Sequence, residues 1–225
     1  MSYSAIMIEP RKHLAYELVL LNFLENLTNE WQFHLFVGND NDEYVREIVN
    51  RLTDNERKRI CIHNIGIKNL TYTEYNKLLI EPFIYSFIPT EIFLIFQTDC
   101  IINPQYKHLI NDFLSYDYVG APWLSDGQVG NGGLSLRNKT KMMEIINNKR
   151  WNGSTNEDHF FSFYHPINKP TLNLAKCFSV ETIFHEQSFG IHSCWRYLSK
   201  SQISYLENSC PLLTELMRLQ GCEKN

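Results

Sequence analysis

The sequence predicts an α/β fold in which a mainly parallel central sheet is flanked by helices. Strand-like and helix-like patterns alternate through the first hundred residues, and this β-α-β-α-β-α-β order is typical of parallel sheets with covering helices. Residues 92–96 (Ile-Phe-Leu-Ile-Phe) are also apolar at every position, as expected of a strand that is buried on both faces of a sheet.

Each element of the first half has its own pattern. Apolar side chains recur at helical spacing over residues 13–27, and a turn cluster over 38–42 opens a charged helix. Pro82 removes a backbone donor, so we expect it to distort or divide the helix that contains it. The predicted strands are 5–8, 31–37, 59–65 and 92–96, and the predicted helices are 13–27, 43–52 and 72–87.

The second half is richer in loops. A short helix over 103–114, a strand over 134–136, a helix capped by Asn156 and a C-terminal helix are the elements that its patterns predict. No internal repeat, low-complexity tract or linker interrupts the chain. We therefore expect a single domain over 1–225, with a core over about 5–197 and a C-terminal helical segment over 198–225.

Composition excludes several classes of protein. Of the 225 residues 44% are hydrophobic and 13% aromatic, which excludes a disordered chain, and the net charge of −4 argues against a nucleic-acid binder. No apolar stretch approaches the roughly 20 residues of a membrane span, and the first residues lack the pattern of a signal peptide. The six cysteines form no CxxC pair, so we expect free thiols and a cytoplasmic location.

Asp99 follows the buried strand over 92–96 directly. Ligands of open α/β sheets bind at the carboxyl ends of such strands, and an unpaired carboxylate there is costly to bury. We therefore predict a divalent cation that carries an anionic ligand. The alternative is an acid that caps the following turn.

A glycine cluster lies between Gly127 and Gly133, which holds four of the ten glycines of the chain. Glycines allow a backbone to approach a ligand closely, but this spacing matches neither a Walker loop nor a GxGxxG fingerprint. The cluster is either a turn into the next strand or a turn that contacts a ligand. Trp123 nearby either stacks on a sugar ring or fills the core.

Two further groups of residues carry potential chemistry. Glu157 and Asp158 follow Asn156 at a helix start, where acids interact favourably with the helix dipole and where one of them could also act as a general base. His185 and His192 lie near the C-terminus. A lone histidine is more often a filler than a ligand, but Asp99 and His192 together would supply the oxygen and nitrogen ligands of a divalent site.

Several motifs in this order resemble a glycosyltransferase-like family with members in large DNA viruses, including a domain of a chlorella-virus protein, and in other microbes. The resemblance covers about residues 5–197. It implies the GT-A fold, a nucleotide-sugar donor and a divalent cation, usually Mn²⁺ or Mg²⁺. The motifs are Glu9-Pro10-Arg11, Tyr75-Asn76-Lys77-Leu78-Leu79, Gln97-Thr98-Asp99, Val129-Gly130-Asn131-Gly132-Gly133-Leu134-Ser135-Leu136-Arg137, Asn156-Glu157-Asp158-His159-Phe160-Phe161 and Phe189-Gly190-Ile191-His192.

The resemblance also implies roles for single residues. Asp99 resembles the last acid of the metal-binding DxD motif, whose first acid is replaced here by Gln97, and His192 resembles the late histidine on the metal or the diphosphate. Asp158 resembles the catalytic base of inverting enzymes. The other residues implied in donor or sugar binding are Glu9 and Arg11 near the base and ribose, Asn131, Gly132 and Gly133 under the sugar, and Thr98, Trp123 and Glu157.

The sequence therefore predicts a metal-dependent glycosyltransferase. We expect it to move a sugar from a nucleotide sugar, with a UDP-sugar favoured, to a hydroxyl of a glycan or small-molecule acceptor, with inversion favoured. A viral source would place it in the host cytoplasm or a viral factory. A nucleotidyltransferase, which would release pyrophosphate, and a non-catalytic module that binds nucleotide sugars are the alternatives.

Overall fold

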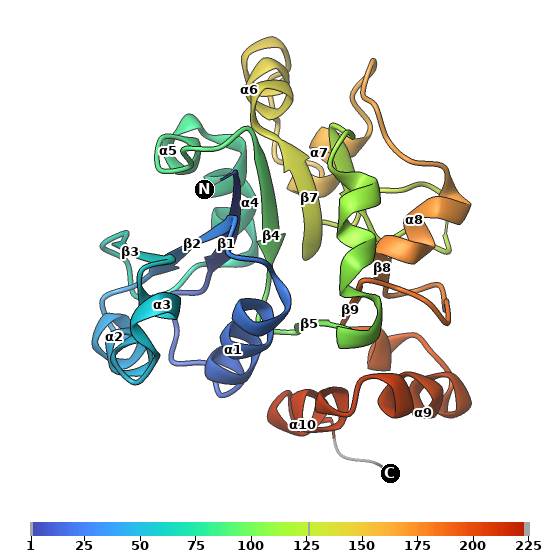
Figure 1. Ribbon diagram of the computed structural model, residues 1–225. Coiled ribbons are helices and arrows are strands. Elements are labelled where there is room, and N and C mark those ends of the chain that lie inside the picture. Colours follow the sequence, from blue (N-terminus) through green and yellow to red (C-terminus); the bar gives the residue numbers. More distant parts are fainter. Residues whose placement is uncertain (1, 126, 223–225) are drawn as a thin grey trace.

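A six-stranded sheet forms the centre of the molecule (Figure 1). The computed structural model describes residues 2–125 and 127–222. In the strand order β3-β2-β1-β4-β7-β6 the first four strands are parallel, and β7 is antiparallel to both of its neighbours. The strands are β1 (Tyr3–Ile8), β2 (Trp31–Val37), β3 (Ile60–Asn64), β4 (Ile92–Phe96), β6 (Tyr118–Gly120) and β7 (Leu134–Asn138).

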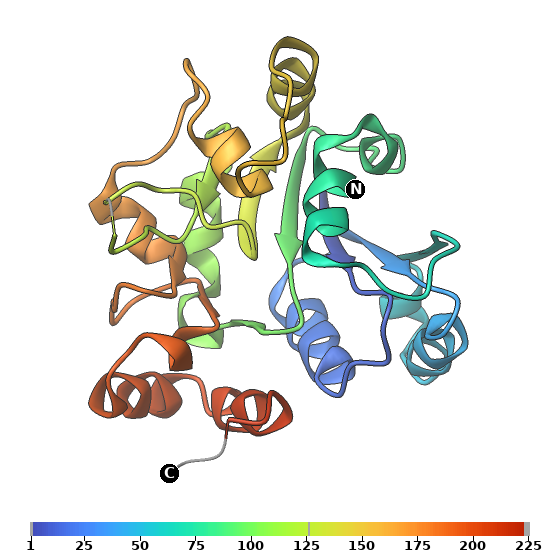
Figure 2. The same ribbon diagram turned by 180° about the vertical axis from the view of Figure 1, so that it is seen from behind.

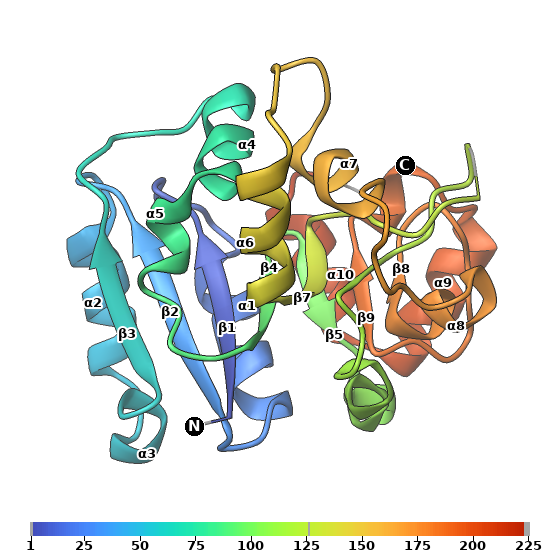
Figure 3. The same cartoon turned by 90° about the horizontal axis from the view of Figure 1, so that it is seen from above.

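Helices cover both faces of this sheet (Figure 3). Side chains alternate along a strand, so Ala5 and Met7 of β1 join one hydrophobic cluster while Ile6 and Ile8 join another. The first cluster includes α1 (Tyr16–Asn26) and α2 (Asp42–Asn50). The second includes α4 (Tyr72–Ile80), α5 (Pro82–Tyr85), α6 (Lys139–Asn148) and α7 (Glu157–Ser162).

A second sheet of three strands in the order β5-β9-β8 connects distant parts of the chain. Its strands are β5 (Cys100–Ile102), β8 (Ser179–Val180) and β9 (Gly190–His192). Cys100 pairs with His192 in the antiparallel register of β5 and β9, so the end of β9 lies beside Asp99. The C-terminal helices α9 (Lys200–Ser209) and α10 (Leu212–Leu219) lie next to this sheet, and Figure 2 shows the same arrangement from behind.

The predicted fold class is confirmed: the central sheet is mainly parallel and is flanked by helices. Pro82 divides the helix predicted over 72–87, because α4 ends at Ile80 and α5 begins at the proline. The helix predicted over 103–114 is the 3₁₀ helix η1 (Pro104–Phe113), and the C-terminal helix is two helices. The further helical elements, which we did not predict, are α3 (Asp54–Arg57), α6, α8 (Leu172–Phe178) and η2 (Cys194–Arg196).

The helix α6 escaped prediction for a physical reason. Its sequence is mostly polar, and only Met142 and Ile145 are buried, so the apolar period of a helix is weak. Its start is stabilised by a cap, in which the amide of Lys141 donates to Oδ1 of Asn138 at 2.8 Å.

The six cysteines are free thiols. Across residues 2–125 and 127–222, the helices all fall short of the length and apolarity that crossing a membrane requires.

Candidate functional site

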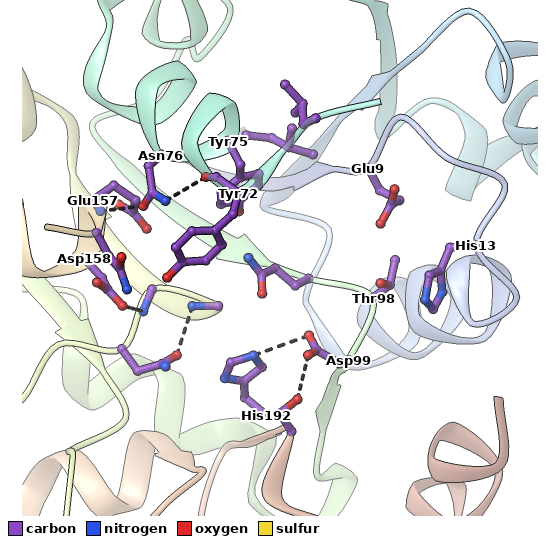
Figure 4. A pocket seen from close by; sticks show the side chains of 18 of the residues that line it. Glu9, His13, Tyr72, Tyr75, Asn76, Thr98, Asp99, Glu157, Asp158 and His192 are labelled. Carbon is purple, nitrogen blue, oxygen red and sulfur yellow. Dashed lines mark hydrogen bonds and ion pairs between the residues drawn. The ribbon is translucent and has the colours of Figure 1, made fainter. Parts of the chain in front are cut away.

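A pocket of about 530 Å³ opens where β1 and β4 end (Figure 4). Every residue that the sequence assigned to the site lines this pocket, with the exception of Trp123. The Trp123 ring instead packs against the rings of His159, at 4.5 Å between centroids, and Phe163, at 6.1 Å. The residues that line the pocket as predicted are Glu9, Arg11, Gln97, Thr98, Asp99, Asn131, Gly132, Gly133, Glu157, Asp158 and His192.

Asp99 and His192 lie together at one side of the pocket, as predicted (Figure 4). Nε2 of His192 is 3.4 Å from Oδ1 of Asp99, and its Nδ1 is 3.4 Å from Oε1 of Glu181. The imidazole is therefore placed between two carboxylates. Glu181 is 5% exposed, and Nδ2 of Asn131 donates to its Oε1 at 2.9 Å.

These contacts set the protonation of both groups. Burial disfavours the charge of Asp99, but the nearby His192 charge and the hydrogen bond from Ser193 outweigh it and hold the pKa of the Asp99 carboxyl well below its usual range. Burial likewise lowers the pKa of His192, while Asp99 and Glu181 raise it by more. Without a cation, the site thus consists of an imidazolium between two carboxylates.

Ser193, which follows His192 in the chain, holds Asp99 in place. Its hydroxyl donates to Oδ2 of Asp99 at 2.6 Å, and its amide donates to the Asp99 carbonyl at 3.1 Å. Ser193 has a φ of 46°, which is rare for a residue with a side chain. The two hydrogen bonds to Asp99 give a reason for this strained conformation to persist.

The glycine loop fits closely around the pocket. A Cβ at Gly133 would lie 2.3 Å from Nε2 of His192 and 2.9 Å from Oε1 of Gln97. A Cβ at Gly132 would lie 2.3 Å from Oε1 of Glu157. Neither position has room for a side chain, so these glycines are needed for close packing of the site rather than for an unusual φ.

Asp158 lies on another side of the pocket, at the start of α7 (Figure 4). Its Oδ1 accepts a hydrogen bond from the amide of His159 at 2.7 Å, and its Oδ2 accepts one from the amide of Gly132 at 3.3 Å. Burial, followed by the neighbouring Glu157 charge, raises the pKa of Asp158 to about 6. A carboxylate of this basicity suits proton transfer near neutral pH.

Glu157, the preceding residue, is bound to Arg137 in the interior. The two residues form a bidentate pair of 2.6 and 2.9 Å, and the exposed fractions of their side chains are 0% for Arg137 and 5% for Glu157. Arg137 also lies over the rings of Tyr118 and Phe161. Asn156 occupies the N-cap position of α7 as predicted, but its side chain makes no capping hydrogen bond.

Glu9 and Arg11 form the far rim of the pocket. The Arg11 guanidinium binds both carboxylate oxygens of Glu9, at 2.8 and 2.7 Å, and Nδ2 of Asn41 donates to the carbonyl oxygens of both residues. The hydrogen bond to Glu9 raises the pKa of Arg11. His13, which the sequence did not single out, lines the same rim.

The donor set at Asp99 and His192 fits a divalent cation. Oδ1 of Asp99 is buried and makes no hydrogen bond within residues 2–125 and 127–222. At 3.4 Å from Nε2 of His192, it could share one cation with the imidazole, because hard divalent ions bind at about 2.0–2.6 Å. Cys100 is close enough to count as a third ligand, but its thiol donates to the Gly133 carbonyl at 3.2 Å and burial raises its pKa.

Sequence reasoning missed several residues of the pocket. Glu181 carries no local signal, because it follows a strand of only two residues and belongs to no recognisable motif. The side chain of Gln220 donates to the carbonyl of Thr98 at 2.7 Å, so the end of α10 contacts the loop that carries Asp99. The other pocket residues that sequence reasoning missed include Tyr72 and Arg196, whereas Tyr75 and Asn76 lie in a motif that it quoted without assigning them a role.

Comparison with known families gives a match over residues 60–192, from β3 to His192, to the model described as a protein of unknown function (DUF5672). This match covers more than half of the chain. The chain belongs to the DUF5672 family. The matched part of this DUF5672 protein contains Asp99, the glycine loop, Asp158 and His192, while Glu9 and Arg11 precede it. No curated protein matches the sequence.

Solved structures show which fold the DUF5672 chain has. The galactosyltransferase LgtC, in complex with donor and acceptor sugar analogues, superposes with a TM-score of 0.59 at 11% identity, over 99% of this chain and 96% of its own. The glycosyltransferase GlyE of Streptococcus pneumoniae gives 0.57 at 11% identity, over 97% of this chain and 63% of its own. The mannosyltransferase PcManGT of Pyrobaculum calidifontis, in complex with GDP-Man and Mn²⁺, gives 0.54 at 11% identity, over 75% of this chain and 54% of its own. The fold of this DUF5672 protein is thus GT-A-like.

Proposed function

We propose that this chain is a metal-dependent glycosyltransferase. It would transfer a sugar from a nucleoside-diphosphate sugar, with UDP-sugars as the favoured donors, to an acceptor hydroxyl. One observation carries the proposal: a single pocket holds a buried carboxylate–imidazole pair, Asp99 and His192, and a separate basic carboxylate, Asp158. The similar structures support the same chemistry, because LgtC is in complex with donor and acceptor sugar analogues and PcManGT with GDP-Man and Mn²⁺.

Asp99 and His192 would hold the cation, Mn²⁺ or Mg²⁺, together with the diphosphate. When bound, a divalent cation stabilises the negative charge that develops on a departing diphosphate. Ser193 keeps Asp99 oriented, and the Glu181 carboxylate lies 3.4 Å from Nδ1 of His192 while Nε2 faces Asp99. The closely packed Gly132 and Gly133 allow the backbone to lie directly under the transferred sugar.

Asp158 would act as the general base. With a pKa of about 6 it is mostly ionised at pH 7, and it can accept the proton of the acceptor hydroxyl as that oxygen attacks the anomeric carbon. Attack on the face opposite to the diphosphate gives inversion in one step. Glu157 is occupied by Arg137, so its role in our proposal is to hold the start of α7 rather than to contact the sugar directly.

The decisive experiment measures the released product. Purified protein is incubated with Mn²⁺ and a panel of nucleotide sugars, and nucleoside diphosphate and pyrophosphate are assayed separately. Nucleoside diphosphate supports sugar transfer. Pyrophosphate would show a nucleotidyltransferase, and donor binding without turnover would show a binding module. The anomeric configuration of the product, read by NMR, tests inversion.

Three variants assign the roles. Asp158→Asn should lower turnover by about 10²–10⁴-fold and leave donor affinity unchanged, because it removes a general base. Asp99→Ala should weaken Mn²⁺-dependent donor binding in calorimetry. Asp112→Asn, an exposed acid on η1, is the control and should match the parent. The kcat/KM of the parent should fall below about pH 6, because Asp158 then takes up a proton. Turnover of Asp158→Asn at the parental rate would show that Asp158 is not the general base.

The motif resemblance to viral proteins leaves a source among large DNA viruses as a prediction. Neither the acceptor nor the donor sugar is named by this resemblance.

A further inference from the structure

Tyr72 is an aromatic residue that lines the pocket and yet has 67% of its surface exposed. Figure 4 shows its ring reaching from α4 into the pocket on the side of Asp158. The Tyr72 phenol points to the side of the pocket that holds Asp158 (Figure 4), and desolvation, followed by the charges of Asp158 and Glu157, raises its pKa. An aromatic side chain with a polar tip, exposed in a pocket beside a candidate base, can offer a flat apolar face to a ligand.

The position of this ring relative to Asp158 is fixed by the backbone. Thr71 caps α4 in a reciprocal capping box with Glu74, so Tyr72 begins the helix in a defined place. Asn76, one turn later, donates to the Tyr72 carbonyl at 2.7 Å and accepts at 2.6 Å from the amide of Glu157. One side chain thus connects the backbone under Tyr72 to the start of the helix that carries Asp158.

A second tyrosine lies in the wall of the same pocket. The hydroxyl of Tyr75 is buried in the pocket wall and has no hydrogen-bond partner in the described part of the chain. An unpaired buried hydroxyl is costly unless a ligand satisfies it.

We infer that Tyr72, with the Tyr75 hydroxyl, forms a subsite for the acceptor, and that the acceptor is an uncharged sugar ring. This inference rests on the proposed function, because it takes Asp158 as the base that receives the acceptor proton. One face of a pyranose is apolar enough to stack on an aromatic ring, while its edge carries hydroxyls that can reach Asp158 and Tyr75.

The charges around Tyr72 favour a neutral acceptor. Glu157 is neutralised by Arg137, so Asp158 is the carboxylate that faces this end of the pocket with no cation bound to it. The pocket-lining Arg196 acts electrostatically on Asp99 at the other side. An acceptor with a phosphate or carboxylate would be repelled by Asp158, whereas a neutral sugar can donate a hydroxyl to it.

A binding measurement tests the subsite without requiring turnover. Saturation-transfer NMR and titration with methyl pyranosides of glucose, galactose and mannose, and with methyl glucuronide as a charged probe, are applied to the parent and three variants. Tyr72→Ala should weaken the binding of the neutral sugars by about tenfold, which corresponds to ~1.4 kcal/mol. Tyr72→Phe keeps the ring and should bind like the parent. Tyr205→Ala removes an exposed tyrosine on α9 outside the pocket and is the matched control.

Each contrary outcome has a distinct meaning. Equal sugar affinity in Tyr72→Ala and the parent, or no binding of any neutral pyranoside, overturns the subsite. So does tighter binding of methyl glucuronide than of methyl glucoside. A loss of UDP affinity in Tyr72→Ala as large as the loss of sugar affinity would place the ring under the nucleobase. Melting curves of each variant confirm that it is folded. The absence of nucleoside-diphosphate release in the parent, by contrast, contradicts the proposed function alone.

Discussion

Replacement of Arg137 by Met tests how the interior supports the site. Arg137 is fully buried, binds both oxygens of Glu157, donates to Oγ of Ser135 at 2.9 Å and lies over the Tyr118 ring at 4.8 Å. Methionine keeps much of the packing volume but leaves the Glu157 carboxylate buried without a cation. Breaking a buried pair in this way costs about 3–5 kcal/mol of unfolding free energy. For a chain of this size, that loss lowers Tm by roughly 6–20 °C.

Urea and thermal unfolding, followed by circular dichroism, measure the effect. The double variant Arg137→Met/Glu157→Leu removes both charges, so it should recover most of the stability that the single variant loses. Arg46→Met, in the exposed i,i+4 pair with Asp42, is the control and should cost less than ~0.5 kcal/mol. Two outcomes would refute this reasoning. One is a loss of unfolding free energy below about 1 kcal/mol in Arg137→Met. The other is a loss in the double variant as large as the sum of the losses in the two single variants.

Two further predictions follow from the same kind of evidence. Burial, and then His63, lowers the pKa of His34 to about 4, whereas the unfolded value is near 6.5. The neutral imidazole therefore stabilises the fold above pH 6.5. Up to ~3 kcal/mol of the unfolding free energy is lost as the pH falls from 6.5 towards 4. The difference in unfolding free energy between the parent and His34→Gln should change across this interval, and a pH-independent difference would contradict the assignment. Gly133→Ala should displace His192 or Gln97, because the added Cβ would lie too close to both side chains. Since this perturbs the surroundings of a candidate metal ligand, Mn²⁺ affinity in calorimetry should fall by at least about tenfold. Unchanged Mn²⁺ affinity would show that these side chains can move aside.

Where local pattern decides structure, the sequence was sufficient. The apolar run of β4 identified a strand that is buried on both faces, and its carboxyl end placed Asp99 in the pocket. The motifs also predicted that Asp99 and His192 lie close together, and their side chains are 3.4 Å apart. The roles of these residues in catalysis stay predictions.

Contacts between distant segments could not be predicted in the same way. In the sequence Arg137 is an ordinary charged residue at the end of a strand. Only the folded chain shows that it forms an ion pair with Glu157 in the interior. Glu181 meets His192 because β8 pairs with β9, and neither short strand has an apolar period long enough to recognise. Trp123, which the sequence left as either a sugar-stacking or a core residue, packs against His159 and does not line the pocket, so its role in sugar binding stays a prediction.

The pairing of β5 with β9 has a consequence for how the protein matures on the ribosome. All four parallel strands precede residue 97, whereas the partner of Asp99 arrives more than ninety positions later, with His192 and Ser193. A nascent chain can therefore build its parallel core long before it possesses a cation site. A fragment that stops ahead of β9 contains all four parallel strands but lacks His192 and Ser193, so it has no complete cation site.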